Sequence, residues 1–186
     1  MLSTSEIKDY LKKNLKESRY IHTLGVVQTA KELASLNGVP IDKAELAALG
    51  HDIAKNLSIE DMIDIMKSNN IELTKSEEDT KELWHSIISP IIAKEKLLIT
   101  DEEVLSAMRW HTTGKEEMSI LEKIIYIADM IEPGRSFPGV DELRKVVYDN
   151  LDNGVLMGLN HTINYLSSKG FAIDENTLKA RDYLIS

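Results

Sequence analysis

Histidine and aspartate residues in apolar surroundings are the part of this sequence that could carry out chemistry. His51 and Asp52 are adjacent, near the end of a segment rich in alanine and leucine. Asp129 lies in the apolar stretch 124–131, where an unpaired carboxylate would be costly. Imidazole and carboxylate groups are natural ligands for iron, manganese, zinc and related ions. The pattern predicts a metal site in the core of a helical bundle, with further candidate ligands at His22, His85 and His111.

Each of these residues also has a structural interpretation. A single histidine on a helix is more often a hydrogen-bonded structural residue than a ligand, and Asp129 alone would suit a buried ion pair. The joint placement of several such residues near apolar helix positions favours the metal site. His161 matches no ligand pattern, and we interpret it as an ordinary helix residue.

The elements that must position these residues are helices, because no segment alternates with the period of two that strands require. Ser3-Thr4-Ser5-Glu6, Thr100-Asp101-Glu102-Glu103 and Ser119-Ile120-Leu121-Glu122 each fit a capping box that opens a helix. A single all-α domain over residues 1–186 is the simplest prediction. Helices are expected at about 3–15, 19–36, 42–52, 58–68, 76–98 (one or two helices), 100–110, 119–131, 141–149, 152–169 and 177–184.

Three local features refine this prediction. Asp42 is expected to cap the helix that contains His51 and Asp52. Pro90 is expected to mark a helix boundary or a first turn. Apolar spacing in the helix at 19–36 predicts an inner face of Ile21, Leu24, Val27, Ala30, Leu33 and Ala34.

The composition limits the class of ligand and of location. The chain has 186 residues, a net charge of −9 and no cysteine. This acidity argues against binding to nucleic acids or anionic membranes, which requires a basic surface, but a metal with a few local cations can bind a small phosphorylated ligand. The first residues lack the features of a signal peptide, and no apolar stretch approaches the ~18 residues of a membrane span. We therefore expect a soluble cytoplasmic protein.

The candidate residues lie in stretches that resemble a known family. The order His, His-Asp, Asp resembles the HD-domain superfamily of metal-dependent phosphohydrolases. The resemblance extends over roughly residues 17–182 to the YqeK family of bacterial symmetrical bis(5′-nucleosyl)-tetraphosphatases. It is carried by RYIHTLGV at 19–26, GHDIAK at 50–55, RWHTTG at 109–114 and IADMIEPGR at 127–135.

This resemblance implies an all-α HD-domain helical bundle and hydrolysis of diadenosine tetraphosphate into two ADP. It also implies one or two iron ions, with manganese or another divalent metal as the alternative. His85 and His111 fall where dinuclear members hold a second metal, whereas in a mononuclear site they would face the phosphates. Gly50 departs from the family, in which a larger apolar residue is usual before the His-Asp pair. The metal-ligand pattern itself falls on His22, His51, Asp52 and Asp129.

Several residues are expected to bind the nucleotide. Arg19, Lys55 and Arg135 adjoin the ligand positions in sequence and are candidates for phosphate contacts, beside His85 and His111. Thr112 and Gly114 could donate to phosphate, although an ordinary helix-end loop is an equal alternative. Phe171 and Ile173 could sandwich the base or simply pack on the core. We expect Asp52, Lys55 and Asp129 to take part in catalysis.

Two other functions compete with a tetraphosphatase. One is a different HD-type nucleotide phosphohydrolase, either a nucleotidase or a cyclic-nucleotide phosphodiesterase. The other is a non-catalytic nucleotide-binding regulator, against which the intact set of His and Asp residues argues. The expected partner is a small dinucleoside polyphosphate, without nucleic acid or membrane. A homodimer is compatible with the sequence, which does not fix the oligomeric state.

Overall fold

The computed structural model describes residues 2–186, and within this range all regular secondary structure is helical. The prediction of an all-α fold is therefore confirmed. The helices are α1 (Thr4–Asn14), α2 (Glu17–Leu36), α3 (Ile41–Gly50), α4 (Ile59–Ser68), α5 (Lys75–Asp79), the 3-10 turn η1 (Lys81–Leu83), α6 (Trp84–Leu97), α7 (Glu102–Trp110), α8 (Ile120–Ile131), α9 (Val140–Asp149), α10 (Leu151–Ser168) and α11 (Glu175–Ile185).

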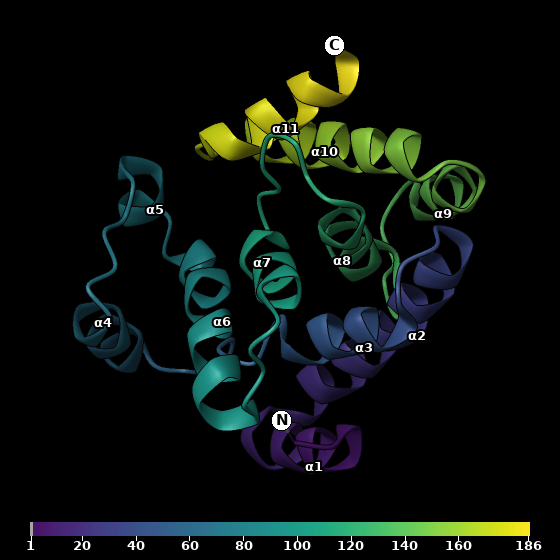
Figure 1. Cartoon of the computed structure of the whole chain (residues 1–186). Helices are drawn as coiled ribbons and strands as arrows, with labels where there is room; N and C mark the ends of the chain where they lie inside the picture. The colour runs from purple at the N-terminus through teal and green to yellow at the C-terminus, as the bar shows by residue number, and fades with distance from the viewer. Residues whose placement is uncertain (1) are drawn as a thin grey trace.

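Helix α8 is the central element of the bundle. It packs against α2, α3, α7, α9 and α10, while α10 and α11 cross one end of the molecule and α1 lies at the other (Figure 1). Its sequence is apolar almost all round, which is typical of a helix buried on most sides. The buried residues are Leu121, Glu122, Ile124, Ile125, Tyr126, Ile127, Ala128 and Ile131.

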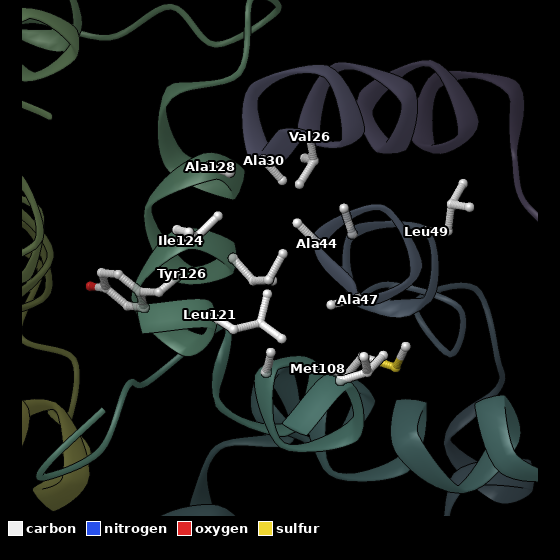
Figure 2. Packing of buried hydrophobic residues seen from close by; sticks show 14 of the residues in the cluster. Val26, Ala30, Ala44, Ala47, Leu49, Met108, Leu121, Ile124, Tyr126 and Ala128 are labelled. Atoms are coloured by element: carbon white, nitrogen blue, oxygen red, sulfur yellow. The ribbon is translucent and has the colours of Figure 1, made fainter. Parts of the chain in front are cut away.

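Small residues let the helices around α8 approach closely. Ala30 of α2 and the pair Ala44 and Ala47 of α3 are fully buried and face the apolar side of α8 (Figure 2). Alanine adds little bulk, so larger neighbours such as Leu121 and Met108 fill the remaining space. This packing brings the end of α3, which carries the His-Asp pair, into the middle of the bundle.

Two of the three predicted capping boxes are confirmed. Ser3 with Glu6, and Ser119 with Glu122, make both hydrogen bonds of the motif. The helix at 102–110 differs in detail, because its cap is Asp101, whose carboxylate accepts from two backbone N–H groups, and not Thr100.

Two other local predictions were wrong. Asp42 lies inside the first turn of α3, whose N-cap is Pro40, and the helix ends at Gly50 before the His-Asp pair. Pro90 lies inside α6 and does not mark a boundary. A proline there removes only one backbone donor, and packing of this largely buried helix outweighs that loss.

The inner face of α2 is also shifted from the prediction. Ile21 is 62% exposed, and Leu24 is only half-buried. His22 must face the interior, and its neighbour one position earlier, about 100° away around the helix, turns outward. The buried residues of α2 are Thr23, Val26, Val27, Thr29, Ala30, Leu33 and Ala34.

Among residues 2–186, no helix has both the length and the apolarity that crossing a bilayer would require.

Two helical glycines give a matched test of this packing. A Cβ at Gly154 would lie 2.6 Å from the Val147 backbone Cα, whereas a Cβ at Gly50 would meet the end of the flexible Met108 side chain, 2.8 Å from Sδ. Gly154→Ala should lower the free energy of unfolding by about 1–3 kcal/mol, and Gly50→Ala by less than about 1 kcal/mol. Denaturant unfolding of the metal-free proteins, followed by circular dichroism, measures both. Equal losses would contradict this account.

Candidate metal centre

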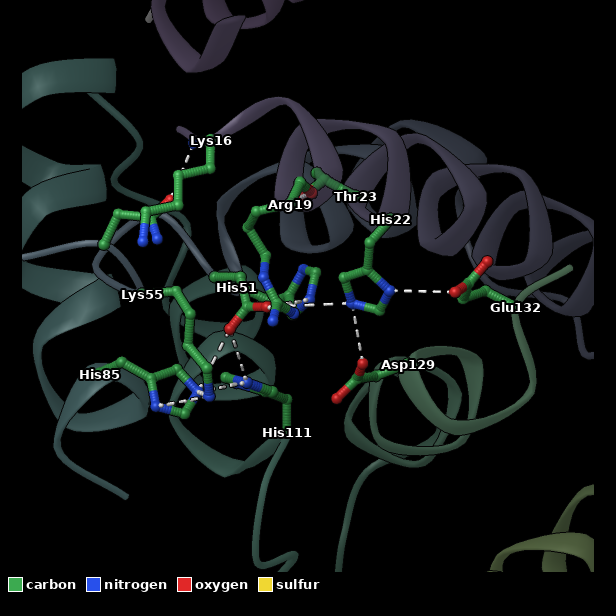
Figure 3. A network of polar contacts seen from close by, with 12 residues as sticks. Lys16, Arg19, His22, Thr23, His51, Lys55, His85, His111, Asp129 and Glu132 are labelled. Carbon is green, nitrogen blue, oxygen red and sulfur yellow. Dashed lines mark hydrogen bonds and ion pairs between the residues drawn. The ribbon is translucent and has the colours of Figure 1, made fainter. Parts of the chain in front are cut away.

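The predicted ligands come from five segments that meet in the middle of the bundle (Figure 3). His22 projects from α2, and His51 and Asp52 follow the end of α3. His85 lies in the first turn of α6, His111 directly follows α7, and Asp129 lies in α8. The side chains of His51, Asp52, His85 and His111 are almost fully buried, with at most 4% exposed.

The carboxylates of Asp52 and Asp129 lie close to all four imidazoles. Asp52 Oδ1 lies 3.2 Å from His85 Nε2 and 3.6 Å from His111 Nε2, and its Oδ2 lies 3.5 Å from His51 Nε2. His22 Nε2 lies 3.0 Å from Asp129 Oδ1 and 3.8 Å from Asp52 Oδ2. The six side chains therefore form one cluster in which every imidazole presents the same nitrogen, Nε2, to a carboxylate.

The opposite nitrogen of each imidazole, Nδ1, has a hydrogen-bond partner of its own. Nδ1 of His51 donates to the Ala48 carbonyl at 2.6 Å, and Nδ1 of His111 donates to the Met108 carbonyl at 2.7 Å. Nδ1 of His85 donates to the Glu82 carbonyl at 2.7 Å, and His22 Nδ1 is 3.1 Å from a Glu132 carboxylate oxygen. Carbonyl and carboxylate oxygens only accept, so Nδ1 carries a hydrogen, and in each neutral imidazole the lone pair is therefore on Nε2.

Lone pairs therefore face lone pairs in this cluster. His22 Nε2, His51 Nε2 and Asp52 Oδ1 are buried without a hydrogen-bond partner among the described residues. A bound cation would satisfy them, and metal-binding histidines commonly donate their other N–H to a carbonyl or carboxylate. The residues present thus fit a divalent metal, with donor atoms within 4.8 Å of one another in two sets: His22, His51 and Asp129, and His51, Asp52 and His111.

The protonation states also suit metal binding. Burial would raise the pKa of Asp52, but its contacts with the imidazoles of His51, His111 and His85 lower it well below its usual range. Burial likewise opposes, but does not prevent, a lowered pKa of Asp129, which results chiefly from its contact with His22. Burial lowers the pKa of His85 to about 4. At neutral pH both carboxylates are therefore ionised and His85 is neutral.

Three cationic side chains border the cluster, and all three were predicted from the sequence. Arg19 Nη1 donates to Asp52 Oδ2 at 2.7 Å, and Arg135 Nη2 donates to Asp129 Oδ1 at 2.5 Å. Lys55 Nζ lies 3.2 Å from His85 Nε2, and burial lowers its pKa. Residues 51–57 form i→i+3 turns instead of a continued helix, and these still direct Lys55 to the cluster.

A cavity of about 450 Å³ opens beside the cluster, toward α10. It is bounded by groups from the cluster, including Asp129 and Arg135, and by aromatic side chains beyond it. The rings of Phe137 and His161 lie 4.6 Å apart and are tilted by 36°. The lining residues are His111, Thr112, Tyr126, Asp129, Met130, Arg135, Phe137, His161, Thr162 and Tyr165.

Of the other predicted nucleotide-binding residues, some line the cavity and others do not. Thr112 lines the cavity, but the Gly114 N–H donates to the Trp110 carbonyl at 2.9 Å and is not free for a phosphate. Phe171 is 59% exposed, and neither it nor Ile173 is among the described residues that line the cavity.

Sequence reasoning missed three residues near the centre. His161, which we interpreted as an ordinary helix residue, faces the cavity together with Phe137. Glu132 contacts His22 and is only 5% exposed. Glu132 stands inside the motif IADMIEPGR, three residues after Asp129, and this spacing on one helix face was an available signal. No comparable pattern marks Phe137 or His161.

The fold and the centre together define an HD-type domain, in which helices bring a His, a His-Asp pair and an Asp to one metal site. The HD-domain family model matches residues 19–134, and the chain belongs to this family. Within it, the chain belongs to the family of symmetrical bis(5′-nucleosyl)-tetraphosphatases.

The relatives that place it there match it almost end to end. The proteins of that name from Bacillus subtilis and Halalkalibacterium halodurans are 38% and 40% identical to it, over 95% and 94% of this chain and 94% and 93% of theirs. A crystal structure from Clostridium acetobutylicum, described as a predicted HD superfamily hydrolase involved in NAD metabolism, is 46% identical. It superposes with a TM-score of 0.96 over 100% of this chain and 98% of its own.

Replacing Asp52 tests the centre directly. Asp52→Ala should abolish metal retention, because its carboxylate is the group that His51, His85 and His111 share. Metal content per chain, measured by mass spectrometry after gel filtration, should fall to background while circular dichroism still reports a helical fold. Asp152→Ala, which removes an exposed carboxylate paired with Lys123, is the control and should retain metal. A metal-replete Asp52→Ala protein would refute the assignment.

Proposed function

We propose that this chain is a metal-dependent phosphohydrolase that cleaves diadenosine tetraphosphate symmetrically into two ADP. The observation that carries the proposal is a buried His and Asp cluster fitted to a metal and bordered by Arg19, Lys55 and Arg135. Such a centre suits a substrate with several phosphate charges. The choice of a dinucleoside tetraphosphate is supported by family membership, because relatives over nearly the whole chain are named for that activity.

For the metal we propose iron, held by His22, His51, Asp52 and Asp129. Imidazole with carboxylate is a donor set that suits iron, and manganese is the alternative. The lone pairs of His85 and His111 also face Asp52, which supports a second ion at the same cluster. If only one ion binds, these two imidazoles instead face the phosphates.

In the proposed reaction, water adds between the second and third phosphates. A new P–O bond forms, the bridging P–O bond breaks, and ADP leaves. A bound divalent metal supplies a Lewis acid and a water of lowered pKa. Arg19, Lys55 and Arg135 hold the phosphate oxygens in line and offset the negative charge that spreads over them. Asp52 and Asp129 act as ionised metal ligands, and the buried surroundings keep bulk water away from the bond that breaks.

The cavity beside the centre is the proposed nucleoside site. Its aromatic lining suits a planar base, and its boundary includes Arg135 and Thr112, which can reach the adjoining phosphate. Phe137 and His161 thus replace Phe171 and Ile173 as the favoured base contacts. Part of the cavity lining, from Phe137 to Tyr165, lies beyond the segment that the family model matches. This supports one functional domain over residues 1–186.

Two further features stay predictions. A homodimer is compatible with this proposal, because every residue that it uses comes from one chain. A cytoplasmic location is expected from the sequence and agrees with a nucleotide substrate.

The reaction products test the proposed activity. Protein loaded with Fe²⁺ or Mn²⁺ should convert diadenosine tetraphosphate into ADP alone, measured by anion-exchange chromatography. Formation of ATP and AMP would exclude symmetrical cleavage. Turnover of mononucleotides or cyclic nucleotides in preference would favour another HD-type phosphohydrolase. Tight nucleotide binding without turnover under any metal would favour a regulator.

A pair of phenylalanines tests the nucleoside site. Base stacking on an aromatic side chain contributes about 1–3 kcal/mol, so Phe137→Ala should raise KM for diadenosine tetraphosphate roughly 5- to 150-fold, with a smaller change in kcat. Phe171→Ala removes an exposed aromatic residue outside the cavity and should leave KM unchanged. Steady-state kinetics on both variants measure this. A raised KM for Phe171→Ala with an unchanged KM for Phe137→Ala would instead favour the loop around Phe171 as the base site.

A further inference from the structure

Glu132 is a buried carboxylate that the proposed reaction does not use. It directly follows α8 and is 5% exposed. Its Oε1 accepts from His22 Nδ1 at 3.1 Å, and its Oε2 accepts from the Gly134 backbone N–H at 2.5 Å. Figure 3 shows the Glu132 carboxylate at one ring nitrogen of His22 and the Asp129 carboxylate at the other. Glu132 therefore holds the far nitrogen of an imidazole whose near nitrogen faces the metal centre.

His22 needs such a partner because of its place in the helix. His51, His85 and His111 each donate Nδ1–H to the carbonyl three residues earlier, at or beside a helix end. Carbonyls at helix ends lack an intrahelical partner and are available. His22 lies in the interior of α2, where the neighbouring carbonyls are engaged in the helix. Its acceptor must come from another element, and Glu132 provides it.

Gly25 leaves the space that this carboxylate occupies. It lies three residues after His22, on the same face of α2. A Cβ at this position would be 2.5 Å from Glu132 Oε2 and 3.2 Å from its Cδ. Glycine inside a helix costs about 1 kcal/mol relative to alanine, so its occurrence in the middle of α2 calls for a compensating role. The close approach of the carboxylate gives one.

The loop that carries Glu132 is held from its other side. Arg144 of α9 donates to the carbonyls of Ile131, Glu132 and Arg135, each at 2.9 Å. These bonds fix the backbone on both sides of Glu132 while its carboxylate is held by His22 and Gly134. A Cβ at residue 25 therefore could not be accommodated by a small shift without breaking one of these contacts.

We propose that Glu132 is a positioning residue that fixes the tautomer and orientation of His22, and that Gly25 serves this site by making room for the Glu132 carboxylate. The inference rests on the proposed metal-dependent function but not on its substrate. It predicts that the two residues act as one unit on metal affinity. Outer contacts of metal-bound histidines typically contribute roughly 10- to 100-fold to that affinity.

A double-mutant cycle tests this with Mn²⁺ as the probe. Gly25→Ala, Glu132→Ala and the double variant are titrated with Mn²⁺ against a chelator, without nucleotide. Each single variant should bind Mn²⁺ roughly 10- to 100-fold more weakly than the unaltered chain. The double variant should be no weaker than Glu132→Ala, because the alanine at residue 25 then has no carboxylate to displace. Losses that multiply, or an unchanged affinity of Glu132→Ala, would overturn the proposal.

A matched control separates positioning from general stability. Glu122 is another buried glutamate, but it lies in the first turn of α8, where it takes part in the capping box and accepts from Ser106 at 2.5 Å, away from the centre. Glu122→Ala should lower stability and leave Mn²⁺ affinity unchanged. In metal-free Glu132→Ala, imidazole ¹⁵N NMR should show His22 losing its Nδ1–H tautomer, and Glu132→Gln, which keeps an acceptor, should retain most of it. If Gly25→Ala does not fold, this tautomer shift decides the case alone, and an unchanged His22 tautomer refutes it. A failed assay with diadenosine tetraphosphate would leave these results untouched.

Discussion

The organisation of this protein depends on one unfavourable arrangement. The lone pairs of four imidazoles face two ionised carboxylates inside a helical bundle. Without a cation, this arrangement leaves buried polar atoms unsatisfied, which is costly in an apolar interior. The surrounding segments hold it in place because three of the four outer imidazole nitrogens are bound within their own segments. His51, His85 and His111 each donate to a backbone carbonyl three residues earlier. These local hydrogen bonds orient the three rings without any contact from another helix. The cluster is then completed by packing of these segments around α8.

The fold and the ligands were predictable from the sequence to different depths. Capping boxes at Ser3 and Ser119 depend only on neighbouring residues, and both form as predicted. The candidate metal ligands could be named because their chemistry depends on residue type, and because an unpaired Asp129 would be costly in an apolar helix. The cavity could not be predicted, because Phe137 and His161 meet only through the packing of α10 against α8. Phe171, which we predicted as a base contact, does not line this cavity.

The position of the His and Asp cluster also accounts for the places where predictions from local sequence patterns were wrong. In α2 the apolar spacing placed Ile21 inside, yet the helix turns His22 toward the centre and leaves Ile21 62% exposed. A hydrophobic side chain in water is a modest cost beside a misplaced ligand. Gly25 lowers the intrinsic stability of the same helix and, in our proposal, allows Glu132 to approach. Both departures from an ideal amphipathic helix lie next to the same histidine, which is where conflicts between stability and function are expected.

Charge connects the centre to the class of ligand. The chain carries a net charge of −9, yet three cationic side chains border the cluster that contains Asp52 and Asp129. In the metal-free protein Arg19 and Arg135 are paired with Asp52 and Asp129 and have little charge to offer an anion. In the proposed function, a bound metal would neutralise those carboxylates, and the guanidinium groups would then be available to phosphate oxygens, which guanidinium groups can bind in a bidentate manner. Metal binding would thus create the anion site as well as the reactive one, and an acidic protein would attract a polyphosphate only once its centre is loaded.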